Sequence, residues 1–98
     1  EIRELIVDFI EEYSYGKQII PNTSEYRLYV KENDREIDIY PYQPIDRKFT
    51  THTFIIKTNE LIPNDYYIDI KTKRGQNTNF FEKVLEFSIV SNVSNFNK

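Results

Sequence analysis

The stretch Leu61–Tyr67, Leu-Ile-Pro-Asn-Asp-Tyr-Tyr, constrains the fold of this chain more than any other segment. Pro63 fixes φ and lacks a backbone donor, while Asn64 and Asp65 tolerate turn dihedrals, so the chain is expected to turn here. A leucine, a proline turn and a tyrosine entering a strand form the pattern of a tyrosine corner, whose hydroxyl group bonds nearby backbone in a β-sandwich. An ordinary hairpin corner that uses Tyr66 is the alternative, and both alternatives indicate an all-β domain.

The residues after this turn alternate between apolar and polar side chains, which is typical of a half-buried strand. The side chains expected on its buried face are Tyr66, Ile68 and Ile70. Those expected on its exposed face are Tyr67, Asp69 and Lys71. Similar alternation predicts strands around Phe54 and Ile56 and over 84–90, with a polar loop at 73–79 before the last strand.

A β-hairpin is predicted upstream, formed by Glu25–Lys31 and Glu36–Tyr40 and joined by the polar turn Glu32–Arg35. The side chains expected to point inward are Tyr26, Leu28, Val30, Ile37 and Ile39. Those expected to point outward are Arg27, Tyr29, Lys31, Glu36, Asp38 and Tyr40. Pro41 and Pro44 follow and exclude a central strand there, because proline cannot donate to the ladder.

The N-terminal segment Glu1–Tyr13 fits both a helical stripe and a strand whose inner face carries Leu5, Val7 and Phe9. Its β-branched residues favour the strand. With this segment the chain has six or seven short strands at spacings expected for a sandwich. We therefore predict an all-β fold, an immunoglobulin-like antiparallel β-sandwich of about seven strands over residues 1–91, with 92–98 as a polar tail or linker. A small barrel is the alternative.

Composition excludes several classes of protein. The absence of cysteine rules out a disulfide scaffold and a cysteine-based zinc site. The net charge of −3, from 13 basic and 16 acidic residues, argues against binding nucleic acid through phosphates. No apolar run approaches the roughly 20 residues that span a bilayer, so no membrane partner is expected. Because the chain has no methionine, we expect it to be a trimmed chain or one domain of a longer protein.

The sequence gives no support for catalysis, a metal or a cofactor. His52 is the only histidine and lies between two threonines in a strand pattern, with no nucleophile signature, so a structural or surface role is favoured. Asp34, Glu36 and Asp38 place carboxylates around the predicted hairpin, where calcium could bind. Arg35 interrupts this set, which instead resembles a solvated strand face. We therefore predict a protein that is not an enzyme.

Aromatic side chains are the best candidates for contact with a partner. The chain has eight tyrosines and seven phenylalanines, and exposed rings can stack on sugars or fill a partner's pockets. The outward positions in the strand patterns give Tyr29, Tyr40 and Tyr42 as candidate contact residues. The alternative is that these rings cover the sheet or pack against neighbours across strands.

Four segments together resemble the Ig-like modules in virion proteins of large tailed bacteriophages, including the crAss-like group. They are Glu25–Glu32, the segment Ile39-Tyr40-Pro41-Tyr42-Gln43-Pro44, Leu61–Lys71 and Leu85–Val90. The resemblance covers about 26–90 and consists of strand and turn patterns. The cysteine pair and the tryptophan of antibody domains are missing.

The resemblance implies a structural role in the virion, with assembly contacts to other virion proteins at the capsid, neck or tail. Such modules recur by symmetry, which implies a homo-oligomer or another symmetric assembly. They have no catalytic residues to carry over. The second hypothesis is a carbohydrate-binding or host-surface adhesin module, in which Tyr29, Tyr40 and Tyr42 stack on host-surface glycans.

Overall fold

The computed structural model describes residues 4–10, 13–14, 17–18, 23–48 and 51–91, and nearly all of them lie in strands. The strands are β1 (Glu4–Ile10), β2 (Tyr13–Ser14), β3 (Lys17–Gln18), β4 (Thr23–Glu32), β5 (Arg35–Pro44), β6 (Asp46–Lys48), β7 (Thr51–Lys57), β8 (Asn64–Arg74) and β9 (Asn77–Ile89). A 3₁₀ turn, η1 (Thr58–Glu60), precedes the predicted corner. The expected polar tail at 92–98 lies outside the described residues.

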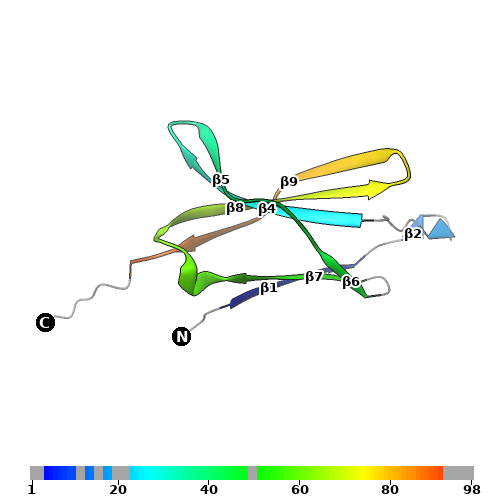
Figure 1. Cartoon of the computed structure of the whole chain (residues 1–98), viewed down its shortest axis with the longest axis horizontal. Helices are drawn as coiled ribbons and strands as arrows, with labels where there is room; N and C mark the ends of the chain where they lie inside the picture. Colours follow the sequence, from blue (N-terminus) through cyan, green and yellow to red (C-terminus); the bar gives the residue numbers. More distant parts are fainter. Residues whose placement is uncertain (1–3, 11–12, 15–16, 19–22, 49–50, 92–98) are drawn as a thin grey trace, which may run out of the picture.

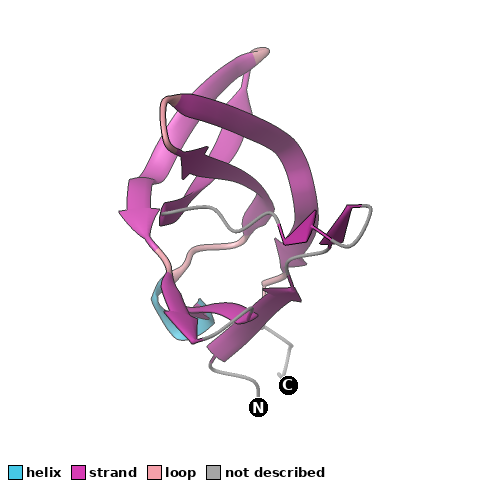
Figure 2. Cartoon of the chain, turned by 90° about the vertical axis from the view of Figure 1, so that its right-hand side faces the viewer, coloured by secondary structure: helices cyan, strands magenta, loops and turns pink. Residues whose placement is uncertain are grey.

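Two antiparallel sheets form the body of the domain, as predicted. The larger sheet has the order β5-β4-β8-β9 and the smaller sheet has the order β1-β7-β6, while β2 and β3 pair separately. The larger sheet lies above the smaller one in Figure 1, and Figure 2 shows its long strands curving over the shorter strands. The seven-stranded antiparallel β-sandwich is therefore confirmed. In this domain β4 lies between β5 and β8, in the sheet that does not contain β1. In a constant-type immunoglobulin domain, by contrast, the second strand lies in the same sheet as the first strand.

The core lies between the inner faces of the two sheets. The larger sheet contributes the buried side chains of Leu28 on β4 and Ile68 on β8. The smaller sheet contributes those of Phe54 and Ile56 on β7. The ring of Tyr26 stacks on that of Phe54 across the sheets, with centroids 4.1 Å apart. Each fully buried side chain of this size contributes about 1.5–3 kcal/mol, so these facing residues hold the layers together.

The tyrosine corner is present as predicted. Tyr66 is buried at the start of β8, and its hydroxyl group donates to the backbone oxygen of Ile62, 2.5 Å away. The Tyr66 ring also stacks on Phe87 of β9, with centroids 5.4 Å apart. Burial raises the pKa of the Tyr66 hydroxyl, which keeps it protonated as a donor. The corner thus fixes where the chain enters the central strand.

The β4–β5 hairpin has the predicted turn but a different register. Its turn residues Asn33 and Asp34 have positive φ, as a two-residue hairpin loop requires. Opposite Leu28 and Tyr29 lie Tyr40 and Asp38, so Ile39 is an extra residue in β5. This β-bulge reverses the predicted alternation at Tyr40, and a second register shift between Tyr40 and Gln43 restores it.

Two predictions about the side chains of this hairpin are wrong. Tyr40 was expected outward, but it faces inward opposite Leu28 and packs against the core. Ile37 and Ile39 were expected inward and buried, but both are exposed. Ile39 occupies the bulge, and Ile37 lies near the hairpin tip, which projects away from the smaller sheet (Figure 1).

Three other predictions about the strands agree with the structure only in part. The strand alternative for the N-terminal segment is confirmed by β1, which pairs antiparallel with β7. Pro41 and Pro44 lie in β5 at the edge of the larger sheet, where proline is tolerated. The polar loop predicted at 73–79 is wrong. Only Gly75, with φ +60, and Gln76 form the turn, and β9 already begins at Asn77.

Replacing Tyr66 by phenylalanine tests the contribution of the corner. We expect Tyr66→Phe to lower the free energy of unfolding by about 1–2 kcal/mol, because the hydrogen bond from the buried tyrosine to the Ile62 backbone oxygen is lost. Urea denaturation measures this change. The matched control is Tyr67→Phe on the opposite face of the same strand, which should lose clearly less. Equal losses in the two variants would contradict a specific role for the corner.

Candidate functional site

A buried carboxylate organises the outer face of the larger sheet. The side chain of Asp69 on β8 was expected to be solvated, but the residue is only 3% exposed. Its Oδ2 accepts from Arg27 Nε at 3.0 Å and from an Arg27 terminal nitrogen at 2.8 Å. Its Oδ1 accepts from the Tyr29 hydroxyl at 3.0 Å and from the Lys83 backbone N–H at 2.8 Å. Four hydrogen bonds from two neighbouring strands, β4 and β9, thus compensate for the loss of water.

The strand registers bring these donors together. Arg27 lies directly opposite Asp69 in the pairing of β4 with β8. On the other side, Ile68 pairs with Leu85 and Ile70 pairs with Phe81, so two steps along β8 correspond to four along β9. The extra residues form a bulge in which Lys83 has φ 52. This bulge brings the Lys83 amide to the carboxylate.

Arg27 connects the buried carboxylate to the exposed ones. Its guanidinium also contacts Glu36 at 2.5 Å and Asp38 at 3.1 Å on β5. Burial disfavours the charged form of Arg27, but the hydrogen bonds to Glu36 and Asp69 outweigh it and the pKa of Arg27 is raised. Glu36 and Asp38 are therefore an arginine-binding pair on the strand face. No metal-binding group of three or more acidic or histidine residues is present in the part of the chain that the structure describes.

The structure separates the three tyrosines predicted as contact residues. Tyr29 points outward as expected, but it is only 1% exposed because the Arg27 guanidinium lies 4.1 Å above its ring. Burial accordingly raises the pKa of the Tyr29 hydroxyl. Tyr40 packs on the core from the inner face. The exposure expected of Tyr29 and the outward orientation expected of Tyr40 are therefore wrong, because Tyr29 is buried and Tyr40 is partly buried against the core.

Tyr42 is the one candidate of the three that reaches the outer surface. It is half-buried, with the Lys71 ammonium 4.5 Å from its ring centroid and the Phe80 ring 6.4 Å away in an edge arrangement. Burial raises the pKa of the Tyr42 hydroxyl. Tyr42 therefore supports one wall of a surface groove.

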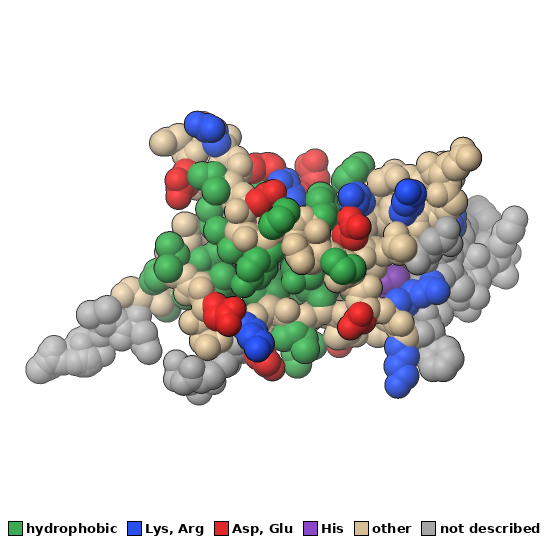
Figure 3. All heavy atoms as spheres, viewed as in Figure 1, with side chains coloured by type: hydrophobic (Ala, Val, Ile, Leu, Met, Phe, Trp, Pro, Cys, Tyr) green, Lys and Arg blue, Asp and Glu red, His purple; other side chains and the backbone are tan. Residues whose placement is uncertain are grey.

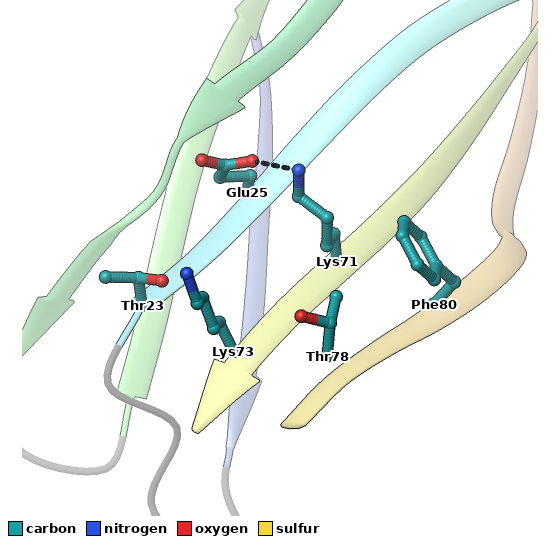
Figure 4. A pocket seen from close by; sticks show the side chains of 6 residues that line it. All are labelled: Thr23, Glu25, Lys71, Lys73, Thr78 and Phe80. Carbon is teal, nitrogen blue, oxygen red and sulfur yellow. Dashed lines mark ion pairs between the residues drawn. The ribbon is translucent and has the colours of Figure 1, made fainter. Parts of the chain in front are cut away.

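This groove crosses β4, β8 and the first part of β9. It has a volume of about 480 Å³ and is lined by Thr23, Glu25, Lys71, Lys73, Thr78 and Phe80 (Figure 4). Lys71 is paired with Glu25 at 2.9 Å, and Thr23 lies opposite Lys73 in the strand register. Phe80 is 61% exposed, so its ring is accessible. Sequence reasoning missed this groove because it assigned part of β9 to a loop.

The contacts of His52 indicate a structural role for this side chain. The residue is buried on β7, its Nδ1 lies 2.8 Å from the Ser24 hydroxyl oxygen, and its ring stacks on Phe9 with centroids 4.5 Å apart. A serine next to a histidine can form a nucleophilic pair. Here both residues are buried in the sandwich, so a substrate cannot approach the hydroxyl group. The pair joins the two sheets instead.

Strand β9 is an exposed apolar edge. It is the outermost strand of the larger sheet and has 13 residues. Four of its apolar side chains are exposed, namely Phe80, Phe81, Val84 and Leu85. Phe81 and Leu85 lie opposite the buried Ile70 and Ile68, so they sit on the inner face where the three-stranded sheet does not cover them. Figure 3 shows hydrophobic side chains reaching the surface between rows of charged ones.

Comparisons with known proteins found no relative. No family model, no curated protein and no solved structure matches this chain. Among the described residues, no helix is long and apolar enough to cross a membrane. The functional argument therefore depends on the groove and on the β9 edge.

Substitution of Asp69 tests the buried network. We expect Asp69→Asn to lower the free energy of unfolding by about 3 kcal/mol, because Arg27 loses its buried partner and the new amide opposes the existing donors. Asp38→Asn is the matched control, since it removes an exposed partner of the same arginine and should cost less than about 1 kcal/mol. Denaturant unfolding measures both values. Similar losses in the two variants would contradict the central role of Asp69.

Proposed function

We propose that this domain is a non-catalytic interaction module of a bacteriophage virion, which makes assembly contacts with other virion proteins. The observation that carries the proposal is the exposed apolar edge on β9. Phe80 and Phe81 are 61% and 48% exposed, on a strand whose outer backbone edge has no neighbouring strand among the described residues. The resemblance of the sequence to Ig-like virion modules supports the virion as its location.

The physical reason is that such an edge favours association. Unpaired N–H and C=O groups along an edge strand are a template for another chain, and pockets for alternate side chains add specificity. Burying a phenylalanine side chain contributes about 1.5–3 kcal/mol, so covering Phe80 and Phe81 supplies a substantial part of an interface energy. A structural role rather than catalysis is also supported by the burial of the Ser24–His52 pair.

Mass spectrometry of purified particles from the source organism tests this proposal. We expect peptides of this chain at a fixed ratio to the major capsid protein after the particles have been washed in high salt. The ratio gives the copy number and therefore the symmetry of the site. Host lysate that contains no particles is the control. Absence of the peptides from washed particles would overturn the proposal.

A second candidate function is binding of acidic sugars in the groove beside Tyr42. Exposed Phe80 offers a ring for stacking, Lys73 offers an ammonium group for a carboxylate, and Thr78 offers a hydroxyl group. Sugar sites combine such an aromatic platform with a few polar groups. The glycan hypothesis therefore moves from Tyr29 and Tyr40 to the exposed ring of Phe80, with Tyr42 as its support.

A titration with oligogalacturonate, followed by NMR chemical shifts, tests this second function. We expect shifts confined to the groove, and a loss of affinity of about tenfold in both Phe80→Ala and Lys73→Ala, about 1.4 kcal/mol for each lost contact. Lys48→Ala on β6, outside the groove, is the control and should bind as the wild type does. A neutral glucan of equal length should bind more weakly. Spectra that stay unchanged with both sugars would exclude the groove as a glycan site.

A further inference from the structure

The strand order matches that of an immunoglobulin sandwich from its second strand onwards. In such domains strands A, B, E and D form one sheet and strands C, F and G form the other, with a strand C′ added in variable-type domains. Here the sheets have the orders β1-β7-β6 and β5-β4-β8-β9, and the short pair β2-β3 follows β1. With β1 as strand B and β4 as strand C, the later strands follow as C′, D, E, F and G. Among the described residues, every position except that of strand A is then filled.

The tyrosine corner supports this assignment independently. In immunoglobulin sandwiches the corner tyrosine lies near the start of strand F, after the turn from strand E. Tyr66 lies at the start of β8, after the turn that follows β7, and its hydroxyl group donates to the Ile62 backbone oxygen. The strand order likewise makes β7 strand E and β8 strand F. Both observations therefore place strand A next to β1.

The position next to β1 faces β9 in the other sheet. Strand β7 lies opposite β4, because the Phe54 ring stacks on the Tyr26 ring across the sheets. Strand β6 follows β5 after the single residue Ile45, so it lies on the β5 side of β7 (Figure 1). Strand β1 lies on the other side of β7, towards β8. The next position beyond β1 therefore faces β9.

Partly exposed apolar side chains border this position on both sheets. Phe81 and Leu85 on β9 are 48% and 37% exposed, although they lie on the inner face of the larger sheet. On β1, Leu5 and Phe9 pack against the core but are only partly buried. A strand placed beside β1 would bury all four side chains. It would also pair with the backbone groups along the outer edge of β1.

The charges on β1 indicate what kind of strand fits this edge. Glu4 and Asp8 lie on the exposed outer face of β1, with the exposed Ile6 between them. On the β7 side, Lys57 lies opposite Glu4 and Thr53 lies opposite Asp8, so Asp8 has no cation facing it across the pair. Opposite charges that face each other across strands stabilise a sheet. A strand with a basic side chain opposite Asp8 is therefore favoured.

A second copy of β1 does not meet this requirement. Antiparallel pairing keeps each side chain on its own face of the sheet, so two copies can pair only with a residue at the centre. Pairing centred on Ile6 sets Glu4 against Asp8, which are both acidic. Pairing centred on Leu5 or Val7 sets a carboxylate against Ile6. None of these registers gives Asp8 a cation.

We propose that the edge of β1 binds an extended segment of another polypeptide, which pairs antiparallel with β1, completes the smaller sheet and buries Phe81 and Leu85. The segment alternates apolar side chains, which face β9, with outer side chains that are basic opposite Asp8. Addition of such a strand combines backbone hydrogen bonds with side-chain pockets. The site goes beyond the proposed function, whose contacts are made by the β9 edge, and those contacts do not depend on it.

NMR titration with a synthetic peptide tests this site. The capped peptide Ile-Lys-Val-Thr-Val-Lys places lysines opposite Asp8 and Glu4 and apolar side chains towards β9. We expect chemical-shift changes on β1 and at Phe81 and Leu85, with saturation below about 1 mM. A peptide of the same composition with its two lysines adjacent is the control for non-specific attraction and should not bind there.

Charge reversal at Asp8 tests the register. Asp8→Lys should weaken binding of the lysine peptide about tenfold, because an attractive pair becomes repulsive. The same variant should prefer a peptide in which glutamate replaces the lysine that faces position 8. Asp46→Lys on β6 is the matched control, since it makes the same change at the opposite edge of the same sheet and should bind as the wild type does. Circular dichroism confirms that each variant is folded.

Three results would overturn the proposal. The first is a wild type whose spectrum stays unchanged at about 1 mM peptide, or changes only away from β1 and β9. The second is a chain that dimerises through β1 in ultracentrifugation, which would make a second copy the occupant. The third is protection of every β1 amide from hydrogen exchange without peptide, which would show that a segment of the chain itself fills the position.

Discussion

The buried carboxylate of Asp69 is the interaction on which the outer face of the larger sheet depends. An ionised group that is 3% exposed is tolerated only if its hydrogen-bond acceptors are satisfied, and here Arg27, Tyr29 and the Lys83 amide satisfy them. These donors come from β4 and β9, which flank β8 on its two sides. One side chain therefore fixes three strands relative to one another, at the place where the register of β9 is irregular.

The groove and the exposed edge follow from that irregularity. The extra residues in β9 let the Lys83 amide reach Asp69, and they displace the first part of the strand relative to a regular ladder. Phe80 then lies beside Tyr42 on the outer face, and Phe81 lies on the inner face beyond the cover of the smaller sheet. The same local irregularity thus completes the buried network and leaves apolar side chains at the surface.

Local chemistry explains what the sequence predicted correctly. The tyrosine corner at Tyr66, the β4–β5 turn and the strand β1 all follow from turn residues or from strict alternation, which depend on residues close in the chain. The positions of Tyr40 and Ile39 could not be predicted in this way, because a bulge has no residue signature in β5 and reverses the alternation at Tyr40. Asp69 was wrongly predicted to be exposed, because its hydrogen-bond partner Arg27 lies 42 residues away in the sequence and the pattern of neighbouring residues does not reveal the contact. The groove was missed for a similar reason, since Thr23, Lys73 and Thr78 meet only through the sheet order.

The opposite edge of the larger sheet has its own consequence for assembly. That edge is β5, which contains Pro41, Pro44 and the bulged Ile39. Proline removes donors from an edge and so discourages the addition of a further strand, and β9 contains no proline. A sheet extended through β9 would end in β5 on both sides, so its growth would stop at two copies. Under the proposed assembly function, β9 would therefore join copies and β5 would end the sheet, as in a closed assembly and not an open fibre.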